Sequence, residues 1–293
     1  MPSVQVLGFL TRIRYAPLME KLSRQEYARF SHSPVRCPTL RERVNNLADF
    51  FVLVSTAVKS DEMFWFRGHY DVQHVLVPSA LRGPTIALRR KALGLMPEFT
   101  RVAEMKLARP PHRSEKMLWA QLAQHYGLPT RLLDWTESAT TALFFACLNT
   151  DLDGFVFVLN PVDLNRVSYP GRPRILDPQD EEDHGIIERY LDLGPQASKR
   201  GRYPIAVNPV WNSERLMMQR GVFTLHGSRF EVDPSVVPSL VAIPILKEVK
   251  RGLSQEMQRI GVDEMTLFPE LEHACIHLRR RAGLKTGTGL NDA

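Results

Sequence analysis

The densest group of polar side chains that could do chemistry lies within twelve positions in the middle of the chain. It combines an imidazole, a phenol, hydroxyls, a guanidinium, a carboxylate and an indole: His125, Tyr126, Thr130, Arg131, Asp134, Trp135 and Thr136. Apolar segments flank this group on both sides, so we expect it to form part of a ligand site between two buried elements. Structural roles are open as well, because histidine is favoured at a helix C-terminus and Asp and Thr are common helix N-caps.

A second candidate, Arg67, lies far upstream, after the apolar run 63–66 and before Gly68. A guanidinium at the end of a buried strand must find partners, because an isolated buried charge is costly. Its planar fork would bind a phosphate or a carboxylate, while Gly68 lets the ligand approach the backbone and Phe66 provides an aromatic wall. The structural alternative is an ion pair with an acid such as Asp134. We expect Arg67 and the central group to meet in space.

Gln219 precedes a predicted strand, where its amide could hydrogen-bond a ribose or the backbone. The sequence has no glycine-rich phosphate loop, no His/Cys constellation with metal-ligand spacing and no serine flanked by glycines. It therefore predicts no metal site and argues against the common nucleotide-binding loops and the serine hydrolases.

Periodicity and end signals define the elements that must position these residues. We expect helices at 39–58, 96–107, 115–126, 247–260 and 268–281, and another from Thr136 or Ser138 to Cys147. Strands are expected at 63–66, 131–133, 155–159, 203–207, 222–225 and 240–246, whereas 69–90 reads as a loop. This order predicts an α+β fold with a mixed or antiparallel central sheet and flanking helices, and not a regular βαβ fold.

The same pattern divides the chain into an N-terminal arm at 1–38, one domain at 39–283 and a tail at 284–293. Within the domain, the polar segment 160–202 is rich in Pro and Asp and is expected to be a long insertion or a lid.

The composition is that of an ordinary globular protein, with 44% hydrophobic and 24% charged residues in 293. A net charge of +6 permits a polyanionic partner without requiring one. Three widely spaced cysteines favour a reducing compartment, and no apolar run is long enough to span a membrane. We therefore expect a cytoplasmic protein without a membrane partner.

Around these residues the sequence resembles the FRG domain family, which is named for the triplet found here as Phe66-Arg67-Gly68. The resemblance continues through 124–136 (QHYGLPTRLLDWT), Ala142, Phe145-Ala146 and 219–223 (QRGVF), and ends near 266–269 (TLFP). It covers about residues 40–280, but the family itself has little assigned function.

The sequence is also similar, more distantly, to ADP-ribosyltransferases of the Arg-Ser-Glu type. Their first strand ends in aromatic-Arg-Gly, and a later Ser/Thr-containing strand leads into a helix with Ala and Phe-Ala. This resemblance implies an ADP-ribosyltransferase-like fold and NAD as cofactor, with Arg67 on its phosphate or ribose. It places Phe66, Gly68, Tyr126, Thr130, Arg131 and Trp135 around the cofactor, His125, Asp134 and Thr136 at the nicotinamide side, and Gln219 on the acceptor or ribose.

The implied activity is transfer of ADP-ribose to a protein or nucleic-acid acceptor, or hydrolysis of NAD, as a toxin or phage-defence effector. The sequence does not match the third motif of that family, a catalytic Glu on a later strand, because no carboxylate lies on strand 222–226 and Glu214 precedes it. Two other readings therefore stay open: a non-catalytic module that binds a nucleotide or a protein, and a nucleic-acid-processing protein that uses its basic surface.

Overall fold

The computed structural model describes residues 19–58, 62–198, 201–237 and 239–284. The helices are α1 (Arg24–Phe30), α2 (Leu47–Ala57), the short 3-10 helix η2 (Ser79–Leu81), α3 (Ile86–Gly94), α4 (Met96–Lys106), α5 (Lys116–His125), α6 (Ala139–Ala146), α7 (Pro161–Ser168), α8 (Glu181–Leu191), α9 (Glu214–Met218), α10 (Lys247–Arg259), α11 (Glu264–Leu267) and α12 (Leu271–Arg281). The strands are β1 (Trp65–His69), β2 (Leu132–Thr136), β3 (Gly154–Leu159), β4 (Ile205–Val207), β5 (Gly221–Leu225) and β6 (Val241–Ile245).

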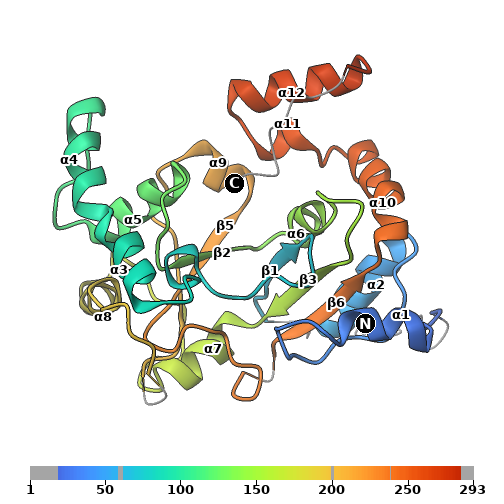
Figure 1. The fold of residues 1–293 in the computed structure, drawn as a ribbon, viewed down its shortest axis with the longest axis horizontal. Helices are drawn as coiled ribbons and strands as arrows, with labels where there is room; N and C mark the ends of the chain where they lie inside the picture. Colours follow the sequence, from blue (N-terminus) through green and yellow to red (C-terminus); the bar gives the residue numbers. More distant parts are fainter. Residues whose placement is uncertain (1–18, 59–61, 199–200, 238, 285–293) are drawn as a thin grey trace, which may run out of the picture.

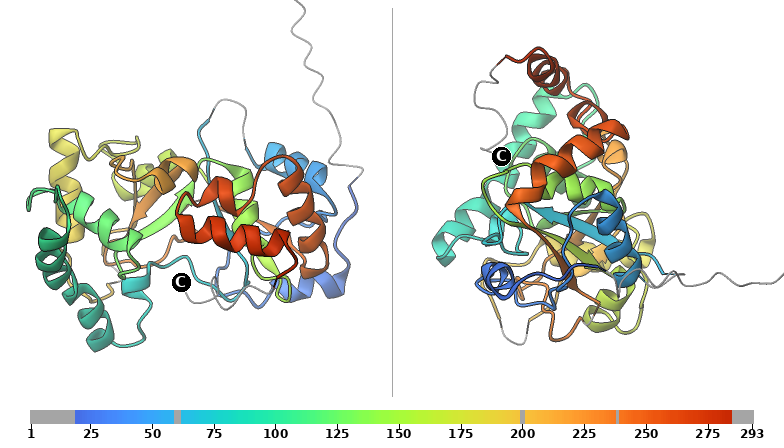
Figure 2. Two further views of the ribbon diagram at one scale, coloured as in Figure 1. Left: turned by 90° about the horizontal axis from the view of Figure 1, so that it is seen from above. Right: turned by 90° about the vertical axis from the view of Figure 1, so that its right-hand side faces the viewer.

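The six strands form one open sheet in the order β4-β5-β2-β1-β3-β6, and every neighbouring pair is antiparallel. Helices flank the sheet, and the pair α3–α4 lies at one end of the molecule while α10 lies at the other (Figures 1 and 2). The predicted α+β fold with a central sheet is confirmed, and the sheet is the antiparallel one of the two expected kinds.

The sheet is nearly divided in its middle. β1 pairs with β3 over five residues and β2 pairs with β5 over five, but the described register between β1 and β2 consists of Phe66 opposite Thr136. Beyond that pair, the two strands no longer form a regular ladder. We call the space between the rest of β1 and the rest of β2 the split.

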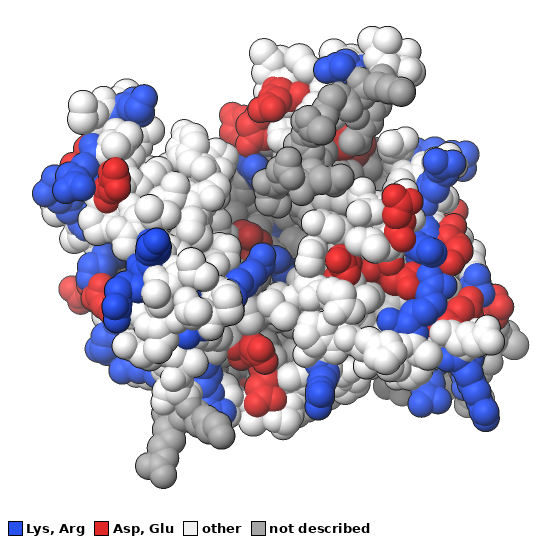
Figure 3. Space-filling view, in the orientation of Figure 1, with Lys and Arg blue, Asp and Glu red and all other residues white. Residues whose placement is uncertain are grey.

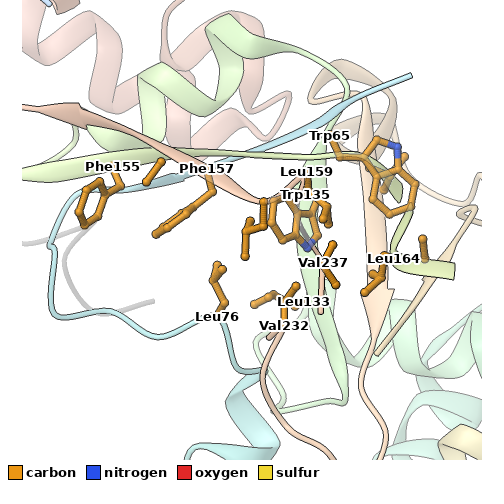
Figure 4. Close-up of a cluster of buried hydrophobic side chains, with 14 of the residues drawn as sticks. Trp65, Leu76, Leu133, Trp135, Phe155, Phe157, Leu159, Leu164, Val232 and Val237 are labelled. Atoms are coloured by element: carbon orange, nitrogen blue, oxygen red, sulfur yellow. The ribbon is translucent and has the colours of Figure 1, made fainter. Parts of the chain in front are cut away.

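Three clusters of buried side chains hold the two halves. One joins α2, α6 and α10 to β1, β3 and β6, and a second joins α5 and α8 to β2, β4 and β5. The third covers the opposite face of the sheet and includes residues of both halves, among them Trp65 and Phe157 from one half and Leu133 and Trp135 from the other (Figure 4). The halves are therefore held together mainly by this shared apolar face.

Several element boundaries differ from the sequence prediction. The helix expected from residue 39 begins at Leu47, because Asn46 caps it by accepting a hydrogen bond from the Asp49 N–H. The strand expected at 63–66 lies at Trp65–His69, so Arg67 is inside the strand and not after it. The expected loop 69–90 contains η2 and most of α3, and the helix expected at 268–281 begins at Leu271 as α12, after the separate short helix α11.

Segment 160–202, expected as an insertion or lid, contains α7 and α8, whose Leu164 and Ile187 are buried in core clusters. Phe30 of α1, within the expected arm, is buried against Phe155 with ring centroids 5.2 Å apart. The predictions for residues 1–18 and 285–293 lie outside the described residues. Within the described ranges, none of the helices is long and apolar enough to cross a membrane.

Candidate functional site

Arg67 lies in the middle of β1, opposite Phe157 of β3, and its half-buried guanidinium reaches across the split. Its Nη1 donates to the backbone oxygen of Asp134 at 2.5 Å, and its Nε donates to Nε2 of His69 at 3.0 Å. Burial, together with the charge of Arg82, lowers the pKa of Arg67 to about 10, while Asp134 opposes the shift. The guanidinium is still cationic at neutral pH and is held by neutral acceptors.

His69 fixes the orientation of Arg67 from the same strand. Its ring is buried edge-on against Phe157 at 4.9 Å between centroids, and burial together with the charge of Arg67 lowers its pKa well below the usual value. Because Nε2 accepts the hydrogen bond from Arg67, the neutral ring carries its proton on Nδ1. A neutral histidine is therefore built into the floor of the site.

Phe66 and Gly68 point to the opposite face, because side chains alternate along a strand. Phe66 is buried in the cluster with α6. A Cβ atom on Gly68 would lie 1.9 Å from the Ala142 backbone oxygen, so this glycine allows α6 to pack closely on β1. The Phe-Arg-Gly triplet thus combines one side chain in the split with two residues that pack against α6.

A second arginine that sequence analysis did not select lies near Arg67. Arg82 follows η2, and its Nε donates to the backbone oxygen of Val77 at 2.8 Å. The backbone N–H of Ala80 donates to the Thr130 oxygen at 3.2 Å, which ties this turn to the start of β2. Burial lowers the pKa of Arg82, and Asp134 opposes the shift, so the same carboxylate acts on both arginines.

Asp134 lies inside β2 opposite Phe223 and is exposed, so the expectation that it caps a helix is wrong. Its Oδ1 accepts a hydrogen bond from Nε2 of Gln124 at 2.6 Å, and the Thr130 hydroxyl donates to Oε1 of the same Gln124. Gln124, at the end of α5, was given no role in the sequence analysis, although it belongs to the central motif. It orients the Asp134 carboxylate, whose charge acts on Arg67.

Thr136 and Gln219 meet at the base of the split. The Thr136 hydroxyl donates to the backbone oxygen of Gln219 at 2.6 Å, and the Gln219 side chain donates to the Leu267 oxygen at 3.0 Å. Of the two expected caps of α6, Ser138 is the one that accepts from the Thr141 N–H. These contacts join β2, α9 and α11, so both residues position elements next to the site.

Arg131 and Trp135 are both buried and hydrogen-bonded within the protein. Arg131 donates to the backbone oxygens of Leu193, Gly194, His226 and Gly227 at 2.5–3.3 Å, and the local ion pair with Asp134 does not form. Trp135 lies in the shared apolar cluster and donates to the Thr224 hydroxyl at 3.0 Å. Both side chains therefore have internal structural contacts.

His125 and Tyr126 close α5 but line a different hollow, together with Arg109 and Ser213. Burial lowers the pKa of His125, with Arg215 adding to the shift and Glu270 opposing it. The structure therefore brings Arg67 to the backbone of Asp134 and joins the side chains of Asp134 and Thr130 through Gln124, and it places His125 and Tyr126 in the neighbouring hollow.

The space-filling view shows a hollow near the middle of the molecule, with basic and acidic side chains at its floor (Figure 3). Around Arg67 the charges are unbalanced, because two arginines share the single carboxylate of Asp134 that acts on both. Among the described residues, no group of His, Cys, Asp or Glu could hold a metal ion. This arrangement is suited to an anionic organic ligand.

A comparison with protein families finds one match in this region. Residues 62–153 match the model of the FRG domain family. The matched segment contains Arg67, Arg82, Gln124 and Asp134, whereas Gln219 lies outside it. No curated protein and no solved structure matches the chain.

Proposed function

We propose that the chain binds NAD or a related nucleotide in the split, with its phosphate and ribose groups against Arg67 and Arg82. One observation carries this proposal: the charges of Arg67 and Arg82 act on each other there, and neither guanidinium forms an ion pair with a described carboxylate. Other arginines of the molecule do pair with acids, as Arg29 does with Asp153 at 2.5 Å and Arg113 with Glu104 at 2.7 Å.

Donors remain on both arginines after their internal hydrogen bonds. Within the described part of the chain, Nη2 of Arg67 and both terminal nitrogens of Arg82 have no hydrogen-bond partner, because Arg67 uses Nε and Nη1 and Arg82 uses Nε. Two planar forks with free N–H groups suit the adjacent phosphates of a dinucleotide. His69 and the backbone oxygens of Asp134 and Val77 preorganise these forks without neutralising their charge.

Asp134 is the residue of the split best placed to contact the ribose. Its carboxylate is a hydrogen-bond acceptor, is exposed and is oriented by Gln124. NAD, when bound, would supply an ADP-ribosyl group with nicotinamide as the leaving group, and the carboxylate would stabilise positive charge that develops on the ribose. This is the transferase or hydrolase form of the proposal, with a protein, a nucleic acid or water as acceptor.

A non-catalytic nucleotide-binding module is the second candidate. It is favoured by the hydrogen bond that already engages Asp134 with Gln124 at 2.6 Å, and by the sequence of β5, Gly221–Leu225, which contains no carboxylate. In this form the same arginines bind the nucleotide and no bond is broken.

Isothermal titration of the purified chain with NAD and with ADP-ribose tests the binding step. We expect binding to wild-type protein and a loss of affinity of about tenfold to a hundredfold in Arg67→Met and in Arg82→Met, because each removes a charge-assisted contact worth about 1.5–3 kcal/mol. Arg113→Met is the matched control, since Arg113 is an exposed ion-paired arginine outside the split. Equal affinity in all four proteins would refute the proposal.

Release of labelled nicotinamide from NAD then separates the two candidates. A transferase or hydrolase releases nicotinamide, and Asp134→Asn slows the release more than it weakens binding. Binding without release, in wild-type protein, identifies the non-catalytic module.

A further inference from the structure

One projecting arm of this protein is basic. Residues 86–115, which form α3, α4 and the loop that follows, contain seven Lys and Arg against three Glu, so they carry a net charge of +4. Their basic side chains are mostly exposed and stand at one end of the molecule (Figures 1 and 3). Such a basic surface is suited to a polyanion.

These charges are available to a partner. Among the described residues, no acid pairs with the exposed Arg90, Lys91, Arg101, Lys106 or Arg109, and Arg113 is the member of the arm that does pair, with Glu104. Acids of the molecule are used elsewhere, for example by the arginines that precede α8. The arm thus keeps its cations free although carboxylates are present on the same helices.

The loop of this arm, with Arg109, lines the hollow that also contains His125, and so does the segment with Asn212; we call these two segments its walls. Tyr126 also lines the hollow and is 61% exposed. Trp211, which directly precedes the lining residue Asn212, is 58% exposed. Exposed aromatic rings beside unpaired arginines are the combination that stacks on bases and holds the phosphates between them.

Both walls are fixed to α5 by side chains that are buried in the protein. The indole N–H of Trp119 donates to the backbone oxygen of His112 at 3.0 Å, which anchors the loop of the arm. Gln121 donates to the Val210 oxygen at 3.1 Å and accepts from the Val210 N–H at 3.0 Å, which anchors the segment with Trp211. The hollow is therefore held open before a ligand arrives, which reduces the entropy lost on binding.

We infer that the arm and this hollow bind single-stranded nucleic acid. The phosphates follow the exposed Arg90, Lys91 and Arg109, and unpaired bases stack on Trp211 and Tyr126. A duplex fits less well, because its bases are stacked on one another and cannot present their faces to the aromatic rings. This inference uses other residues than the nucleotide site in the split and stands independently of it.

Fluorescence anisotropy with labelled 15-nucleotide oligo-dT and oligo-U tests the inference. We expect both to bind more tightly than a duplex of equal length, with an affinity that falls linearly on a logarithmic salt scale by about 0.7 for each phosphate contacted. Trp211→Ala weakens binding by about tenfold, which corresponds to the loss of one stacked base. Arg109→Ala reduces the slope of log affinity against log salt concentration by about 0.7, the value for one phosphate contact.

Arg251→Ala is the matched control, because Arg251 is an exposed arginine of α10, at the opposite end of the molecule (Figure 1). It should leave oligonucleotide binding unchanged. The inference is overturned if Trp211→Ala and Arg109→Ala bind as wild-type protein does, if duplex binds as tightly as single strands, or if poly-glutamate competes as well as an unlabelled oligonucleotide. Titrating Trp211→Ala with NAD separates the two sites, since that variant should retain nucleotide binding.

Discussion

At the scale of single residues, the buried cations of this protein are held by the backbone and not by acids. Arg131 donates to four carbonyl oxygens, and the fully buried Lys250 donates from Nζ to the oxygens of Tyr70 and Asn149, each at 2.9 Å. Burial lowers the pKa of Lys250 to about 8 and that of Arg131 to about 10. Carbonyl oxygens satisfy the donors without cancelling the charge, so these side chains fix loops to the sheet.

His226 illustrates the opposite case, a buried histidine that must stay neutral. Its Nδ1 donates to the Phe230 oxygen at 2.7 Å, and its Nε2 accepts from the Thr224 hydroxyl at 2.8 Å, which in turn accepts from the Trp135 indole. Burial lowers its pKa from 6.5 to about 3. Because the folded pKa lies below the unfolded one, the unfolded chain takes up the proton first, and stability present above pH 6.5 is lost as the pH falls.

We therefore expect the free energy of unfolding to decrease by about 1.4 kcal/mol for each pH unit between about 6 and 4 from this residue alone. Denaturant titrations of wild-type protein and His226→Gln at several pH values measure the difference. The variant should be less stable at pH 7 but show a flatter pH dependence, whereas His32→Gln, a change at an exposed histidine, should leave the slope as it is. Identical slopes in wild-type protein and His226→Gln would contradict this account.

At the scale of elements, the close approach of α6 to β1 sets the geometry of the split. Ala142 and Ala146 present a small-residue face to Gly68, and the Ser138 cap starts the helix immediately after β2. α6 therefore spans from the strand that carries Asp134 to the strand that carries Arg67. Its packing distance controls how far apart these two residues stand.

Gly68→Ala should destabilise the protein strongly. The new Cβ would lie 1.9 Å from the Ala142 oxygen and 2.6 Å from the Ala146 nitrogen, and both are backbone atoms that cannot move aside cheaply. We expect a loss of about 3 kcal/mol or more in the free energy of unfolding. Gly94→Ala is the matched control, because a Cβ at this position of α3 meets no atom within 4 Å. It should stabilise the protein by about 0.5–1 kcal/mol, and equal effects in the two variants would refute the packing argument.

At the scale of the whole molecule, the sheet is best described as two antiparallel halves that share one apolar face. The described ladder joins them at Phe66 and Thr136, and beyond that pair the Asp134 oxygen accepts a guanidinium hydrogen bond from Arg67. Polar groups of the two strands thus face the interior of the fold at a place where the hydrogen bonds of a strand ladder would normally lie. The proposed ligand site therefore lies where the sheet is incomplete.

Much of this architecture could be predicted from the sequence. The continuous apolar run of β3, the Gly127 and Pro129 signals after α5 and the periodicity of α10 each define their element, because local chemistry decides them. The pairing of Arg67 with Asp134 was also predicted, but as an ion pair; in the structure the backbone oxygen, not the carboxylate, accepts the hydrogen bond.

Other features could not be predicted, because they depend on the packing of distant segments. Arg82 gains its position from a turn tied to Thr130, and Arg131 loses its expected role because carbonyls from residues 193–194 and 226–227 surround it. Likewise, α3 is weakly amphipathic and has no buried residue, so its sequence gave little periodic signal. Spacing along the chain identifies candidate residues, whereas their partners follow from tertiary contacts.

The guanidinium of Arg67, which no described carboxylate pairs with, has a cost in stability. Desolvating it costs folding free energy, which the proposed nucleotide binding would explain as a trade-off between stability and binding. Arg67→Met removes that cost but leaves His69 and the Asp134 oxygen without their hydrogen-bond donor. We therefore expect its free energy of unfolding to lie within about 1 kcal/mol of that of wild-type protein. In thermal melts, NAD should raise the Tm of wild-type protein and leave that of Arg67→Met unchanged. A loss above about 3 kcal/mol would instead mean that Arg67 is there chiefly to hold the sheet together.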